Sequence, residues 1–186
     1  KINEELNIHV DGDEPEYFGE ENQTREFKTT TVYPAGNNMR ADVKAQTLEL
    51  MKVICGFLNA EGGTLYLGVN NEGVASGLDN DIEFFGGKDK LDLHIRNNIV
   101  QKFGNDANSR IRIRASENNN KYVYALEIQP SQKPIELDGI YYQRQGSSTW
   151  PLLGDDLEMF RNRREDEVKR LLEKAETDKD SQEADN

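Results

Sequence analysis

The stretch CGFLNAEGGTLYLGVN, residues 55–70, contains the change of chain direction on which the fold depends. Before it, apolar residues recur from Val43 to Leu58, and Asp42 is a good N-cap, so the pattern predicts a helix over 42–59. The glycines at 62 and 63 end this helix, because glycine readily adopts the left-handed backbone of a sharp turn. Residues Thr64–Val69 follow as a buried strand.

Outward from this stretch, short strands and helices alternate. We predict further strands at 24–31, from the Asn70–Gly73 turn to Leu78, and at 110–114, 122–128 and 140–145, with a second main helix over 89–103. The order β-α-β-β-α-β-β-β predicts a single α+β domain, with a mixed or antiparallel sheet and two main helices. This domain occupies 17–154, after a flexible acidic lead-in at 1–16 that includes one short strand at 6–10. A charged helix at 155–173 and a disordered acidic tail at 174–186 follow it.

Composition excludes several classes of protein. The 186 residues contain one Cys and two His, which rules out an internal disulfide framework and a structural zinc site and points to a reducing, cytoplasmic compartment. No apolar run is long enough for a membrane span. The net charge of −12 belongs to the two ends, because residues 27–154 hold 14 acidic and 14 basic side chains. The net charge therefore does not exclude a nucleic-acid partner.

Three blocks of sequence, in this order, carry a resemblance to a known family. They are ENQTREFK at 21–28, the stretch at 55–70 and YYQRQGSST at 141–149. Together they resemble the Schlafen AlbA-type domain, over about residues 17–165. That resemblance implies an α+β domain that binds nucleic acid and, in bacteria, is often part of a longer regulator-like protein. The family has also been described as AAA-like, but GGKD at 86–89 lacks the first glycine and the hydroxyl residue of a Walker A motif, so we do not expect ATP hydrolysis.

The resemblance also implies an alternative, a metal-dependent endoribonuclease. Glu21 and Glu26 match the two acids of the first block, and paired carboxylates can hold the Mg²⁺ or Mn²⁺ that activates water. The third acid is expected after the buried strand, where Asn70 and Asn71 stand instead, so Asn70 would be a neutral third ligand. The competing interpretation is structural, with Glu26 paired to a neighbouring Lys or Arg. No cofactor is expected outside this alternative.

Candidate phosphate contacts come from three places. Strand alternation places Phe27 inward and Lys28 outward, on the same face as Glu26. Alternation also places Arg110, Arg112 and Arg114 in a row on one side of their strand. The end of the last predicted strand offers a guanidinium, a close-approach glycine and hydroxyls, and the predicted contacts there are Arg144, Gly146, Ser147 and Ser148.

The main hypothesis is a cytoplasmic nucleic-acid-binding domain, for DNA or RNA, that contacts mostly phosphates. The resemblance favours a DNA-binding domain of a larger bacterial protein resembling a transcriptional regulator, without enzyme activity. The nuclease is the first alternative. A protein-interaction or oligomerisation module is the second, and a homo-oligomer is compatible with each hypothesis.

Overall fold

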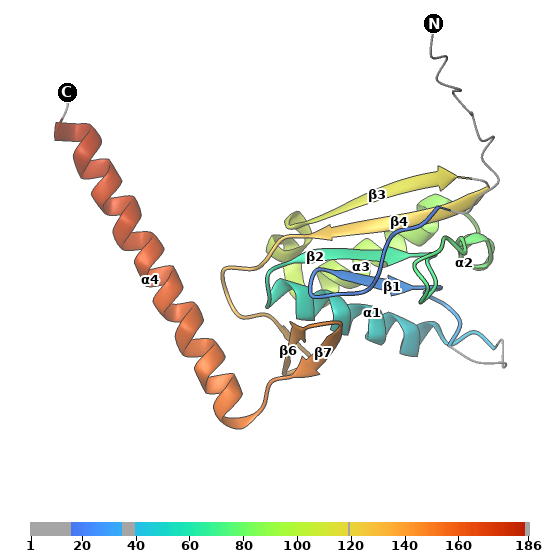
Figure 1. Cartoon of the computed structure of the whole chain (residues 1–186), viewed down its shortest axis with the longest axis horizontal. Coiled ribbons are helices and arrows are strands. Elements are labelled where there is room, and N and C mark those ends of the chain that lie inside the picture. Colours follow the sequence, from blue (N-terminus) through green and yellow to red (C-terminus); the bar gives the residue numbers. More distant parts are fainter. Residues whose placement is uncertain (1–15, 35–39, 119, 185–186) are drawn as a thin grey trace, which may run out of the picture.

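The chain folds into two sheets and four helices within residues 16–34, 40–118 and 120–184, which this computed structural model describes (Figure 1). The larger sheet has the order β1 (Arg25–Lys28), β2 (Gly63–Leu67), β4 (Lys121–Ile128), β3 (Ile111–Asn118). The smaller sheet contains β5 (Glu136–Leu137), β6 (Ile140–Gln145) and β7 (Ser148–Pro151). The helices are α1 (Val43–Leu58), α2 (Asp79–Phe85), α3 (Lys88–Ser109) and α4 (Gly154–Ala184). The predicted α+β class is confirmed, and the sheet is mixed because only β1 and β2 are parallel.

The main core lies between the larger sheet and helices α1 and α3 (Figure 1). Leu65 and Leu67 of β2 enter this core, whereas Tyr66 points to the opposite face. There Tyr66 packs with Phe18, Phe27 and other residues in a smaller cluster. Both faces of the sheet are thus covered near β1, and this decides where the side chains of β1 point.

The helix and strand predicted around 42–69 are confirmed, together with their caps. Asp42 accepts a hydrogen bond from the backbone N–H of Ala45, and α1 ends at Leu58. Gly62 and Gly63 have φ of 78° and 152°. A Cβ at either position would lie about 2.5 Å from a backbone carbonyl oxygen, of Ile128 or of Thr24. This close approach, rather than helix capping alone, requires the two glycines.

The region after β2 differs from the prediction. The expected strand to Leu78 is reduced to isolated bridges, which join Val69 to Ala75 and Tyr17 to Val74. Helix α2 follows, which the sequence pattern does not predict. Its Asp81 is buried and accepts hydrogen bonds from Thr30 and Thr31. A long-range contact of this kind leaves no periodic signal in a helix of seven residues.

The other boundaries shift in ways that have local causes. Helix α3 is interrupted at Gly104, whose backbone is non-helical, so its first segment ends at the predicted residue 103 and a short second segment continues to Ser109. Helix α4 extends to Ala184, so most of the predicted disordered tail is helical; residues 155–184 contain no Gly or Pro. The predicted lead-in and its strand fall almost entirely within 1–15, outside the described residues. Within the described ranges, every helix is too short or too polar to cross a bilayer.

The single thiol gives a direct test of this core. Cys55 is fully buried, and burial raises its pKa to about 11. Because the thiolate is the reactive form, we expect a disulfide reagent such as DTNB at pH 8 to label the native protein at least 10²-fold more slowly than the urea-unfolded chain. Native labelling at the rate of the unfolded chain would contradict the described packing of α1.

Candidate functional site

The guanidinium of Arg144 joins the first and third sequence blocks. Arg144 lies on β6, is 2% exposed, and places Nη1 2.5 Å from Oε2 of Glu26. Its Nη2 donates to the carbonyl oxygens of Asn22, at 2.8 Å, and Arg25, at 2.9 Å. The predicted role of Arg144 as a direct phosphate contact does not fit this placement, because its donors face inward. Arg144 instead fixes the hairpin of β6 and β7 against β1.

Glu26 lies between two cations. Its second oxygen, Oε1, is 2.7 Å from Nζ of Lys28, and its side chain is 8% exposed. The predicted alternation of β1 is present and Phe27 is buried as predicted, but Glu26, which was predicted to face outward, is buried too. Phe27 points to the smaller cluster, whereas Glu26 and Lys28 pair with Leu65 and Leu67 on the helix side of the sheet. The sequence could not show that both faces of β1 are covered.

The structure gives the three predicted metal ligands separate structural partners. Glu21 accepts a hydrogen bond from the backbone N–H of Phe27, at 3.1 Å, and Glu26 holds Arg144 and Lys28. Asn70 accepts backbone N–H groups of its own turn. Among the described residues, no three His, Cys, Asp or Glu side chains are grouped so that they could hold a metal ion.

A cavity of about 330 Å³ lies beside this ion pair, and we call it the hairpin cavity. It brings together predicted binding residues that are more than 100 positions apart in the sequence. Its lining consists of Glu26, Lys28, Glu49, Val53, Arg144, Ser147, Ser148, Thr149 and Trp150. Ser147 and Ser148 are exposed, and the Lys28 side chain is 35% exposed. An ammonium and two hydroxyls are thus available to a ligand in the cavity.

Helix α1 and Gln23 hold the hairpin in place. A Cβ at Gly56 would lie 2.7 Å from Cγ2 of Thr149, so the glycine lets β7 lie directly on the helix. Gln23 donates to the carbonyl oxygen of Arg144 and accepts from the N–H of Gly146. The N–H of Gly146, a predicted phosphate contact, is therefore already engaged. No atom outside the turn lies within 4 Å of where a Gly146 Cβ would be, so the turn is open to an approaching ligand.

Asn59 joins the second block to the smaller sheet. It is 1% exposed, and its Nδ2 donates to the carbonyl oxygens of Ile135, at 2.7 Å, and Tyr142, at 2.8 Å. Its Oδ1 accepts the N–H of Ile135 at 2.8 Å. One amide side chain therefore satisfies three backbone groups of β6 and the segment before β5. The second sequence block, residues 55–70, thus contributes to the fold through its backbone turns and through the Asn59 amide.

The row of arginines lies elsewhere. Strands β1 and β3 are the two edges of the sheet, and Arg112 and Arg114 alternate with Ile111 and Ile113, which face the main core. The two arginines thus lie on the opposite face from Lys28. Arg110 pairs with Asp106 at 3.2 Å, and Arg114 pairs with Glu127 at 2.8 Å. Of the three, Arg112 alone has no ion pair among the described residues.

With this geometry established, comparison with known proteins assigns the family. The family model described as "Schlafen, AlbA_2" matches residues 21–152, from Glu21 to the end of the hairpin. The chain belongs to the Schlafen AlbA_2 family. No curated protein was found to match it.

A solved structure supports the fold. The crystal structure of the DIP2311 protein from Corynebacterium diphtheriae is similar, with a TM-score of 0.51 and 19% identity over 69% of this chain. This chain covers 25% of that protein. At this identity the likeness concerns the fold only.

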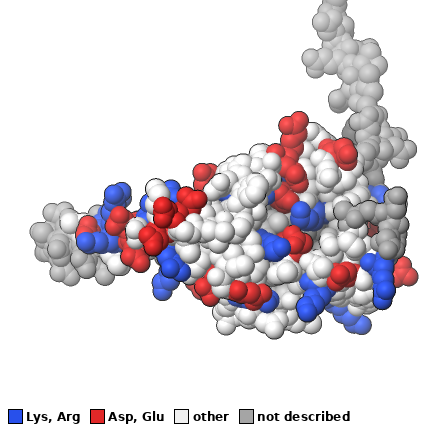
Figure 2. All heavy atoms as spheres, turned by 90° about the horizontal axis from the view of Figure 1, so that it is seen from below, with Lys and Arg blue, Asp and Glu red and all other residues white. Residues whose placement is uncertain are grey.

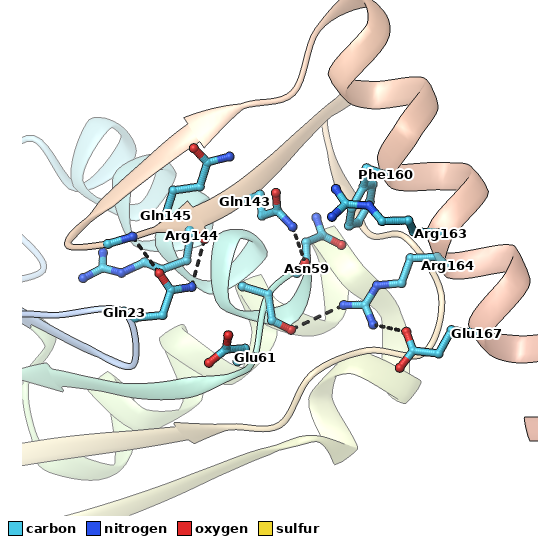
Figure 3. Close-up of a pocket in the computed structure, with 12 residues that line it drawn as sticks. Gln23, Asn59, Glu61, Gln143, Arg144, Gln145, Phe160, Arg163, Arg164 and Glu167 are labelled. Carbon is cyan, nitrogen blue, oxygen red and sulfur yellow. Dashed lines mark hydrogen bonds and ion pairs between the residues drawn. The ribbon is translucent and has the colours of Figure 1, made fainter.

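Helix α4 lies beyond the Schlafen AlbA_2 match and forms a second cavity, of about 470 Å³, against β6 and the α1–β2 turn (Figure 3). Phe160 is buried and anchors the helix. Arg164 reaches the carbonyl oxygen of Ala60 and also pairs with Glu167, and Arg163 extends from the same helix beside them (Figure 3). We did not select these arginines from the sequence. The signal was the sequence RNRR at 161–164, directly after an apolar residue.

The buried ion pair predicts a large loss of stability for Arg144→Ala. Removing Arg144 leaves Glu26 buried with one cation and takes the guanidinium donors away from the carbonyls of Asn22 and Arg25, so we expect a loss of about 3–5 kcal/mol in urea unfolding. Arg144→Lys keeps the charge but loses the planar fork, so its free energy of unfolding should lie between those of the native protein and Arg144→Ala. The exposed Arg112→Ala is the matched control and should stay within about 0.5 kcal/mol. An Arg144→Ala variant as stable as the native protein would contradict the role of this residue.

Asn59→Ala tests the link between α1 and the smaller sheet. The substitution removes two donors and one acceptor from part-buried backbone groups of Ile135 and Tyr142, at about 1–3 kcal/mol each before relaxation, and we expect a net loss of about 3 kcal/mol. Asn97→Ala, at an exposed position of α3, should change the free energy of unfolding by less than about 0.5 kcal/mol. Equal stabilities for the two variants would refute the proposed link.

Proposed function

We propose that this Schlafen AlbA_2 domain binds nucleic acid, DNA or RNA, through phosphate contacts at the hairpin cavity. The observation that carries the proposal is the arrangement of Lys28, Ser147 and Ser148 around one cavity. Ammonium and hydroxyl groups are common partners of phosphate oxygens, and such contacts position a strand without reading its sequence. The membership of a family associated with nucleic-acid binding supports the same conclusion.

The cavity offers cationic surface without needing Arg144 as a contact. Glu26 is held by Arg144 and Lys28 together, so one carboxylate is shared between two cations. The local charge of the three groups is therefore +1. Glu49, also at the cavity, pairs with Lys52 at 2.6 Å. An approaching phosphate would thus meet a small net positive charge at the exposed Lys28.

The rest of the surface does not favour strong electrostatic binding. Lys and Arg side chains are interspersed with Asp and Glu over the face shown in Figure 2. Among the described residues, nine pairs of basic and acidic side chains lie within ion-pair distance. These pairs balance nine of the basic side chains locally, and the excess of acidic over basic residues in the chain further weakens its attraction for a polyanion. We infer that the domain contacts few phosphates and binds with a weak dependence on salt.

The wider setting is also a proposal. We infer that the domain works in the cytoplasm within a larger DNA-binding protein of regulatory function. Support comes from the single cysteine of the chain and from the similar chain from Corynebacterium diphtheriae, of which this chain covers one quarter. That similarity supports only the occurrence of the fold within a longer chain.

Binding titrations with matched variants test the location of the interface. With fluorescent single-stranded and duplex oligonucleotides at several salt concentrations, Lys28→Gln should weaken binding about 5-fold. It should also reduce the steepness of the salt dependence by about one phosphate contact. Arg112→Ala, which removes an unpaired cation from the opposite face, should bind like the native domain.

The reverse result would contradict this location. If Arg112→Ala weakens binding and Lys28→Gln does not, the arginine row is the interface. If the native domain binds neither DNA nor RNA at low salt, the proposed function is wrong, and a protein-interaction module becomes the better hypothesis.

A further inference from the structure

Trp150 is a large apolar ring that the fold leaves in water. It lies on β7 at the hairpin cavity and is 57% exposed. The strand register pairs Thr149 with Arg144 on the inner side of the hairpin and Trp150 with Gln143 on the outer side. Tryptophan is usually well buried in folded proteins. Among the described residues, no aromatic ring or cation stacks on it.

The neighbours of Trp150 point to the chemistry of its ligand. Ser148 lies two positions before it on β7, so the two side chains share a face of the strand and are about 7 Å apart along it. Ser147 and Lys28 line the same cavity. A single nucleotide is therefore long enough to place its base against the Trp150 ring and its phosphate against Lys28, Ser147 and Ser148. A ligand with an anionic group and a flat apolar face fits both features.

The weak charge of the surface indicates how such a ligand would gain affinity. Because the basic side chains are interspersed with acidic ones and the chain carries an acidic excess, phosphate contacts alone supply little binding free energy. Stacking of a base on an aromatic side chain adds affinity that tolerates any sequence and does not require charge. In a duplex, however, each base face is covered by its neighbours in the stack. A ring at the surface of a hairpin can stack only on a base that is unpaired or at an end.

We propose that Trp150 stacks on an unpaired base, so that the hairpin cavity takes single-stranded nucleic acid in preference to duplex. This inference rests on the proposed function and narrows its substrate class. Lys28, Ser147 and Ser148 hold the phosphate next to the stacked base. Preference for a single strand then comes from the ring, whereas the phosphate contacts serve either form.

The experiment uses the fact that Trp150 is the sole tryptophan of the chain. A short oligothymidylate should quench its emission in a saturable way, and the duplex of that strand with oligoadenylate should not. In anisotropy titrations, Trp150→Ala should weaken single-strand binding about 5- to 100-fold and leave duplex binding unchanged. Trp150→Phe, which keeps a ring, should recover most of the affinity. Circular dichroism and thermal unfolding check that both variants are folded, as the exposure of the ring leads us to expect.

The outcomes separate this inference from the function on which it rests. Equal binding of single strand and duplex, or unchanged single-strand binding by Trp150→Ala, would overturn the role of Trp150 while the proposed function stands. Emission that responds only to protein concentration would assign the ring to contact with a second copy and would also overturn it. Absence of binding to either oligonucleotide would refute the proposed function itself. If Trp150→Ala does not fold, Trp150→Phe and the quenching of the native protein decide the question.

Discussion

The buried pair of Arg144 and Glu26 is the constraint on which the other parts of the site depend. Burial of two charges is unfavourable unless they are paired and their remaining hydrogen-bonding groups are satisfied. The structure meets this condition by directing the Arg144 fork to two backbone carbonyls as well, and by placing Lys28 on the other oxygen of Glu26. Because the pair joins β6 to the start of β1, it sets where the hairpin tip lies, and with it the cavity.

The polar residues of the three sequence blocks therefore have different roles from the ligand contacts that the sequence alone suggests. Polar residues of these blocks mostly stabilise the fold. Glu21 accepts a backbone N–H of β1, Asn59 hydrogen-bonds the smaller sheet, and Gln23 hydrogen-bonds the turn between β6 and β7. The groups left for a ligand are fewer and more exposed, namely Lys28, the serines of the turn and Trp150. Binding and stability are thus divided between neighbouring residues of the same motifs.

Sequence patterns were informative wherever local physics decides the structure. The capped helix α1, the turn at Gly62 and Gly63, and the β3–β4 hairpin follow from periodicity and backbone preference, and β6 has its predicted bounds. Long-range contacts decided the rest. Asp81 anchors an unpredicted helix, the covering of both faces of β1 buries Glu26 as well as Phe27, and burial removes Arg144 from the surface. Alternation predicts which residues share a face, but it does not reveal what covers that face.

The central claim is that the hairpin cavity, and not the arginine row on the other face, receives a nucleic-acid strand. Mapping backbone amide shifts by NMR, as an unlabelled short single strand is added to isotope-labelled protein, tests it most directly. The account predicts that the largest shifts cluster at Lys28 and at 147–150, while the amides of Arg112 and Arg114 stay unchanged. Shifts concentrated along β3, with the hairpin unaffected, would contradict it.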